Sequence, residues 1–125
     1  MRMSAVLGKP DMKRDSRNEI TMKIAVPLFG DRVSPHFGAS SQILMIETRD
    51  GKIFHKARID TGAQDPGEIT RRLVSSGVDQ LVCGGIHRVY RQWLTRSGVR
   101  VLDNQKGPAE ALVIKMIESG SKKRR

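Results

Sequence analysis

The 125-residue sequence has three histidines and one cysteine, the side chains that bind soft metals and metal–sulfur species, and His36, Cys83 and His87 are the candidates for such a site. His36 lies in a stretch of about a dozen residues, 30–41, that shows neither helical nor strand periodicity, and loops of this length in a small domain are often functional. Cys83 ends an apolar run, and His87 follows it closely. Imidazole nitrogen and thiolate sulfur bind iron, copper and zinc. Each residue also has an ordinary alternative: His36 as a surface histidine, Cys83 as a small buried hydrophobic residue, and His87 as a helix-start residue that faces water.

A glycine pair, Gly84-Gly85, separates Cys83 from His87, and the pattern of a helix begins directly afterwards. Glycine lets the backbone approach a ligand closely, and the amides at the start of a helix bind anions. Arg88 adds positive charge at the same place. The segment therefore predicts an anion site formed by Gly84, Gly85 and Arg88. A tight strand-to-helix turn with no ligand produces the same pattern and remains an open alternative.

The elements that must position these residues begin with strands and continue as alternating helices and strands. Apolar runs and alternating patterns predict five strands, at residues 24–29, 42–48, 52–60, 78–83 and 99–102. A spacing of about 3.6 residues, with proline or glycine at the ends, predicts three helices, at residues 66–76, 87–97 and 108–119. Pro27 cannot donate a ladder hydrogen bond, so we expect it at a strand end or an irregularity. His55 lies on the apolar side of the third strand and is expected to be structural.

This order of elements predicts an α/β domain with a single mixed five-stranded sheet and three helices. Right-handed crossovers favour the strand order 3-2-1-4-5, with strands 1, 4 and 5 parallel. In such sheets ligands bind beyond the carboxyl ends of parallel strands where the strand order reverses, here between strands 1 and 4. The segments that follow these two strands carry His36, Cys83 and His87. We therefore expect the three side chains to converge on one crevice.

The net charge of +10, from 23 basic and 13 acidic residues, suggests nucleic-acid binding only while the chain is taken as a whole. Residues 1–21 carry +2 and residues 121–125 carry +4, which leaves +4 for residues 22–120. We predict a mobile N-terminal extension over 1–21, one domain over 22–120 and a basic tail over 121–125. A single cysteine excludes an internal disulfide and fits a cytoplasmic protein. No apolar run reaches the roughly 18 residues of a membrane helix, so no membrane partner is expected.

Several enzyme classes lack their motifs in this sequence. It contains neither a P-loop nor a GxGxxG fingerprint, and no Ser/His/Asp arrangement in a recognisable context. The first predicted strand has no carboxylate, whereas a two-metal nuclease of the ribonuclease H type needs acidic residues there. These classes of enzyme are therefore disfavoured, and nothing in the sequence demands more than a monomer.

Four segments of the sequence resemble the dinitrogenase iron-molybdenum cofactor biosynthesis family: residues 22–27, 33–38, 81–86 and 97–101. The similarity extends over about residues 22–119, and its specific parts are the opening of the first strand, at residues 22–27, and the segment Ser34-Pro35-His36-Phe37-Gly38. It implies a ribonuclease-H-like α/β fold without nuclease activity, in small accessory or storage proteins that carry molybdenum or iron–sulfur clusters. Some members, like the orange protein of sulfate reducers, hold a mixed molybdenum–copper sulfide cluster. The resemblance implies that His36 is a cluster ligand.

Our interpretation is a cytoplasmic, non-enzymatic carrier or scaffold that binds a molybdenum- and/or iron-sulfur cluster transiently, between donor and acceptor proteins. The candidate metal ligands are His36, Cys83 and His87. The candidate cluster-binding residues are His36, Phe37, Gly38, Gly84, Gly85 and Arg88. One alternative is a regulatory or protein-interaction module that has kept the fold and lost the cluster. Nucleic-acid binding through the basic termini is a further alternative that we do not expect; it requires an affinity that falls steeply with salt.

Overall fold

The computed structural model of the chain describes residues 21–62 and 65–123. Its elements, in chain order, are β1 (Thr21–Phe29), β2 (Arg32–Val33), the 3-10 helix η2 (Phe37–Ala39), β3 (Gln42–Arg49), β4 (Lys52–Asp60), α1 (Pro66–Ser75), β5 (Gln80–Val82), α2 (Arg88–Arg96), β6 (Arg100–Leu102) and α3 (Ala109–Lys123). None of the helices in these described ranges is long and apolar enough to cross a membrane.

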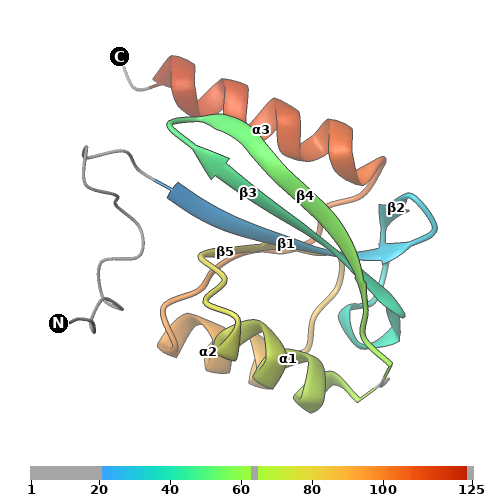
Figure 1. The fold of residues 1–125 in the computed structure, drawn as a ribbon. Coiled ribbons are helices and arrows are strands. Elements are labelled where there is room, and N and C mark those ends of the chain that lie inside the picture. The colour runs from blue at the N-terminus through green and yellow to red at the C-terminus, as the bar shows by residue number, and fades with distance from the viewer. Residues whose placement is uncertain (1–20, 63–64, 124–125) are drawn as a thin grey trace, which may run out of the picture.

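The strands form one mixed sheet in the order β4-β3-β1-β5-β6, with β2 paired to β1 outside this path. β1, β5 and β6 are parallel, whereas β3 and β4 run antiparallel to their neighbours. The predicted order and the predicted parallel strands are therefore confirmed. Helices α1 and α2 cover one face of the sheet and α3 covers the other (Figure 1). This three-layer arrangement places the loops after β1 and β5 at the same end of the sheet.

The sixth strand, β2, lies within the stretch that we expected to be an irregular loop. It pairs with the end of β1 through Leu28↔Val33 and Phe29↔Arg32, beyond the short register in which β1 pairs with β5. Pro27 lies between these two pairings, and its carbonyl accepts a hydrogen bond from the amide of Ser34 at 2.9 Å. The amide and the carbonyl of one strand residue point to the same side of the strand. The missing N–H of Pro27 therefore lies on the side where the partner of β1 changes from β5 to β2. The expected irregularity at Pro27 is thus present.

The core consists of two clusters, one on each face of the sheet. Residues of the central strands alternate between them, so Ala25 and Leu81 pack toward α1 and α2, whereas Val26 and Val82 pack toward α3. Strands that are buried on both faces have nearly continuous apolar sequences. This explains why β1 and β5 were recognisable as strands without a clear alternating pattern. Packing on both faces also fixes the ends of these strands, where the following loops begin.

Three further expectations differ from the structure. Thr21 already belongs to β1, and α3 continues through Gly120 to Lys123, because a single glycine weakens a helix by only about 1 kcal/mol and does not have to end it. The predicted tail therefore begins inside a helix; residues 1–20 and 124–125 lie outside the described residues. His55 is exposed because it lies on β4, the edge strand of the sheet, where Ile59 on the same side is exposed as well.

Candidate functional site

Two loops that lie far apart in the sequence are joined at one end of the sheet. The amide of Gly85 donates to the carbonyl of Pro35 at 2.7 Å, and the amide of Phe37 donates to the carbonyl of Gly85 at 2.8 Å. These bonds form an isolated parallel bridge between His36 and Gly85. The segment after β2 is thereby fixed against the segment after β5, as the topology argument required.

Gly84 makes this close approach possible. A Cβ atom at this position would overlap the carbonyl oxygen of Ser34 and lie 2.7 Å from that of Pro35. The space that we assigned to a ligand is therefore taken by the backbone of the neighbouring loop. The structure supports the tight-turn interpretation for Gly84, which is buried, while Gly85 remains exposed.

Beside this junction lies a hollow of about 370 Å³, which we call the histidine hollow. Its lining comes from the η2 segment, the start of α1 and the start of α2: His36, Phe37, Gly38, Pro66, Gly85, Ile86, His87 and Tyr90. The structure thus brings His36 and His87 together, with Phe37, Gly38 and Gly85 from the predicted binding residues. Gly38 is needed for this packing, since a Cβ there would come within 2.6 Å of Cγ of Pro66.

His36 combines a fixed backbone with an unengaged side chain. The carbonyl of His36 accepts a hydrogen bond from Oγ of Ser34 at 2.9 Å, and His36 is the N-cap residue of η2. The residue is exposed, and its imidazole forms no hydrogen bond with any other described residue. Both ring nitrogens are therefore available to a ligand in the hollow.

His87 is engaged in a different way. It is the N-cap of α2, and its Nδ1 accepts a hydrogen bond from the amide of Val89 at 3.2 Å. Tyr90 stands edge-on to the imidazole, with the ring centroids 6.1 Å apart and the planes at 67°. Nε2 is the nitrogen of His87 that the capping bond leaves available.

The electrostatics of the histidine hollow favour an anion. Pro66 occupies the first turn of α1 and His87 caps α2, so both helices, of ten and nine residues, begin at the hollow. The N-terminus of a helix carries a partial positive charge from its unpaired amides. None of the described residues that line the hollow is acidic. The carboxylate of Asp65, next to Pro66, accepts a hydrogen bond from the amide of Gly67 at 3.2 Å and caps α1, so it offsets part of the positive charge at this helix start.

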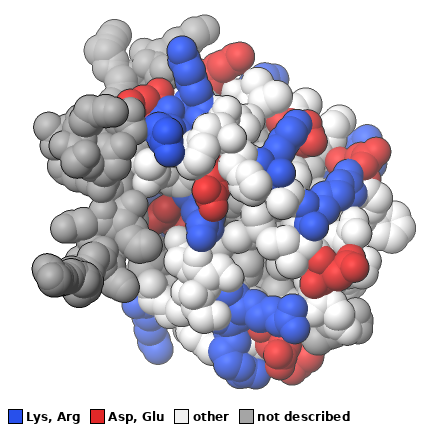
Figure 2. All heavy atoms as spheres, viewed as in Figure 1, with Lys and Arg blue, Asp and Glu red and all other residues white. Residues whose placement is uncertain are grey.

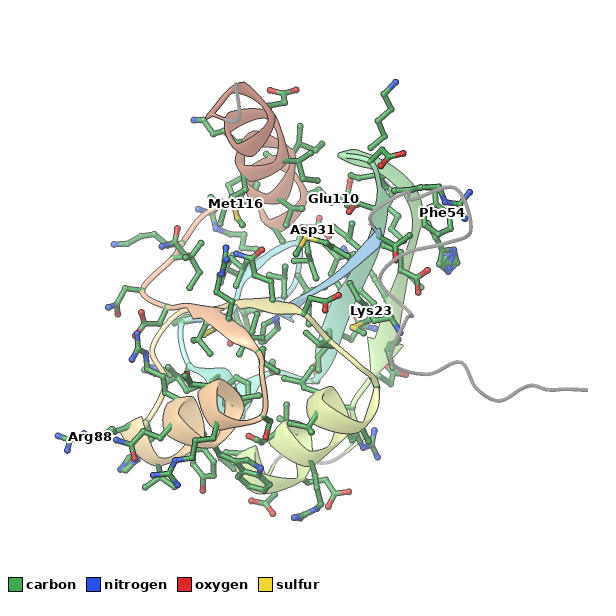
Figure 3. All side chains as sticks on the ribbon, turned by 90° about the vertical axis from the view of Figure 1, so that its left-hand side faces the viewer. Lys23, Asp31, Phe54, Arg88, Glu110 and Met116 are labelled. Carbon is green, nitrogen blue, oxygen red and sulfur yellow. The ribbon has the colours of Figure 1, made fainter. Side chains whose placement is uncertain are left out.

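Cys83 and Arg88 do not line the histidine hollow. Cys83 has no exposed surface and belongs to the core cluster beneath α1 and α2. Burial raises the pKa of its thiol to about 12, with a further increase from Asp103 and an opposing effect of Arg91. A neutral, buried thiol is a poor metal ligand, because metals bind the thiolate. Arg88 reaches outward into solvent from the start of α2 (Figure 3).

The donor set differs from that of a closed metal-ion site. No group of three or more histidine, cysteine, aspartate or glutamate side chains suited to a metal ion occurs among residues 21–62 and 65–123. Two imidazoles and two helix starts suit a species that brings its own ligands and negative charge. The described residues fit an anionic metal–sulfide cluster better than a bare cation.

Sequence reasoning missed three lining residues: Pro66, Ile86 and Tyr90. Pro66 marked a helix start, but the sequence alone does not show that α1 begins beside the loop of His36. Tyr90 had a usable signal, since residues three positions apart share a helix face and it follows His87 at that spacing. Its ring also contacts Phe37, with the centroids 6.5 Å apart.

The comparisons with known proteins identify the family. The sequence matches the profile described as dinitrogenase iron-molybdenum cofactor over residues 20–119, which is most of the chain. The chain belongs to this family. An uncharacterized protein of Methanocaldococcus jannaschii is 39% identical over 44 residues, or 35% of this chain and 37% of that protein. The aligned part therefore spans little more than a third of that relative's length.

Two solved structures have folds similar to that of this chain. A proposed dinitrogenase from Methanocaldococcus jannaschii has a TM-score of 0.66 and 17% identity, covering 80% of this chain and 91% of the other. The orange protein from Desulfovibrio gigas has a TM-score of 0.64 and 20% identity, covering 78% of this chain and 88% of the other. At these identities the likeness shows a shared fold, which confirms the predicted mixed α/β architecture.

Proposed function

We propose that this protein is a non-enzymatic carrier that holds an anionic molybdenum- or iron-sulfide cluster in the histidine hollow and passes it from a donor to an acceptor protein. Family membership supports the general role. The observation that carries the specific proposal is the unengaged imidazole of His36, which lines a hollow where two helices begin.

The chemistry needs few protein ligands because such a cluster supplies its own sulfides. A nitrogen of His36 would coordinate one metal of the cluster, and imidazole is a suitable ligand for iron and copper. The starts of α1 and α2 would stabilise the negative charge of the cargo. A single coordinate bond at an exposed residue favours release to an acceptor, so the site suits a carrier better than a permanent metal centre.

The proposal of binding without turnover rests on family membership and not on the lining, because the imidazoles of His36 and His87 are also groups that acid–base catalysts use. The wider surface supports a small anionic ligand over a polynucleotide. On the face shown in Figure 2, lysine and arginine side chains are interspersed with acidic ones.

An anaerobic titration tests the proposal. The full chain is titrated with a preformed copper(I)–tetrathiomolybdate adduct and with an iron–molybdenum–sulfide cluster, and binding is followed by the visible spectrum after gel filtration. We expect His36→Ala to weaken binding by roughly a hundredfold or more, since even indirect support of a ligand is worth ten- to a hundredfold. The control is His55→Ala, because His55 is also exposed but does not line the hollow.

Two outcomes contradict this proposal. Equal binding by the His36→Ala variant and the unchanged chain removes His36 from the mechanism. If the unchanged chain binds no molybdenum- or iron-sulfide species, the carrier function itself is wrong, and a regulatory module on the same fold becomes the better interpretation.

A further inference from the structure

The capping bond of α2 determines which nitrogen of His87 carries the proton. A neutral imidazole has one N–H donor and one acceptor nitrogen. Nδ1 of His87 acts as the acceptor, because it receives the amide hydrogen of Val89 at 3.2 Å. The backbone of His87 has the extended conformation of an N-cap, φ −68° and ψ 142°, which presents the side chain to the first turn. The proton of the neutral ring therefore lies on Nε2.

We propose that His87 binds the cargo as a hydrogen-bond donor and not as a metal ligand: its Nε2–H donates to a sulfide or oxo group of an anionic cluster held by His36. This inference rests on the proposed function and assigns a separate role within it. Coordination through Nε2 would move the proton to Nδ1, where it would face the amide hydrogen of Val89. Coordination through Nδ1 would displace that amide and leave the start of α2 without its cap.

The surroundings of His87 fit a donor. It lines the same hollow as His36 and Gly85, and a Cβ atom added at Gly85 would lie 4.0 Å from Nδ1 of His36. Tyr90, one turn along α2, stands edge-on to the ring. No described lining residue is acidic and could take the proton of Nε2 in place of a ligand. Hydrogen bonds from such a donor to an anion are about twice as strong as neutral ones.

This assignment defines the class of ligand. One coordinating nitrogen and one directed N–H select an anion that combines an open metal position with an exposed sulfide or oxo group. A bare divalent cation would find only the single nitrogen of His36, whereas proteins hold zinc with three or four ligands. The histidine hollow should therefore distinguish metal–sulfide anions from Zn²⁺.

The tautomer is measurable in the protein without cargo. Long-range proton–nitrogen NMR of the ¹⁵N-labelled full chain distinguishes bare from protonated ring nitrogens, and the His36→Ala and His55→Ala variants assign the three histidines. We expect His87 to have a bare Nδ1 and a protonated Nε2. A His87 that is protonated at Nδ1 contradicts the capping bond and overturns the inference.

Addition of the diamagnetic copper(I)–tetrathiomolybdate adduct separates donor from ligand. We expect the Nε2 proton of His87 to persist and to exchange more slowly with water, while a nitrogen of His36 shifts strongly. Loss of the Nε2 proton on binding would overturn the donor role and leave the proposed function intact. If neither histidine responds, the proposed function and this inference both fail. Zn²⁺ alone should leave His87 unchanged, and coordination of Zn²⁺ by His87 would also overturn the inference.

Two substitutions separate the donor from the cap. Serine is a favourable N-cap but lacks the reach of Nε2–H, so His87→Ser should preserve thermal stability and weaken binding of the adduct by roughly tenfold. His87→Ala should weaken binding similarly and also lower the melting temperature, because the cap is lost. Binding by His87→Ser that equals that of the unchanged chain would show that Nε2–H contributes nothing.

Discussion

Gly84 offers the sharpest test of how the site is built. In Gly84→Ala the new Cβ would overlap the carbonyl oxygen of Ser34 and lie 2.7 Å and 2.9 Å from the carbonyl oxygen and carbon of Pro35. All three atoms belong to the backbone, so no side chain is able to rotate away. The loop must move, and the bonds between Gly85 and its partners Pro35 and Phe37 must lengthen or break.

The expected loss of stability follows from these contacts. Two backbone hydrogen bonds contribute about 1 kcal/mol each, and forcing a methyl group into a filled space costs typically about 1–3 kcal/mol. We expect Gly84→Ala to lower the free energy of unfolding by about 3–5 kcal/mol. For a domain of this size that corresponds to a fall in melting temperature of about 12–20 °C, measured by circular dichroism.

Gly85→Ala is the matched control for this prediction. Its Cβ would lie 3.3 Å from the carbonyl oxygen of Pro35, which a shift of a few tenths of an ångström relieves. Neither glycine has a positive φ, so the two substitutions differ in the available space and not in backbone strain. Gly85→Ala should cost about 1 kcal/mol or less. A melting temperature of Gly84→Ala within about 4 °C of the unchanged chain would refute the close approach of the two loops.

Two further predictions concern Cys83 and Asp65. Because burial raises the pKa of Cys83 from 9.0 to about 12, the unfolded chain releases the thiol proton at lower pH than the folded chain. The free energy of unfolding should therefore fall between about pH 9 and pH 12, and urea titrations of Cys83→Ala should lack this component. Asp65→Asn keeps an N-cap for α1 and removes a negative charge next to the histidine hollow. The affinity for the copper(I)–tetrathiomolybdate adduct should therefore rise about two- to fivefold. An unchanged or lower affinity would contradict an anionic cargo.

The layout of the sheet was predictable because several independent signals agree. The run from Ile24 to Phe29 has the composition of a strand buried on both faces, and right-handed crossovers leave few topologies. β2 was not predictable, since two residues have no periodicity and the strand exists only through its pairing with Leu28 and Phe29. His55 shares its side of β4 with the apolar residues Ala57 and Ile59, but Ile59 is itself 45% exposed, so apolar neighbours on this edge strand did not imply burial.

The candidate site was predictable in its location and only partly in its chemistry. The reversal of strand order between β1 and β5 correctly brought His36 and His87 to one place. Cys83 lies two residues after Leu81 in an extended segment, so both side chains point toward α1 and α2 and the thiol is buried. The space beside Gly84 is filled by the loop of Ser34 and Pro35, a contact between residues almost fifty positions apart that no local pattern reveals.

The metal and sulfide content of the protein purified without oxygen tests most directly whether the histidine hollow holds a metal–sulfide cluster. The full chain, His36→Ala and His55→Ala are purified in parallel from anaerobic cells, and molybdenum, iron, copper, acid-labile sulfide and the visible spectrum are measured. We predict metal together with sulfide, and the corresponding absorption bands, in the unchanged chain and in His55→Ala, with a loss of both in His36→Ala. Metal and sulfide that remain unchanged in His36→Ala would contradict the account.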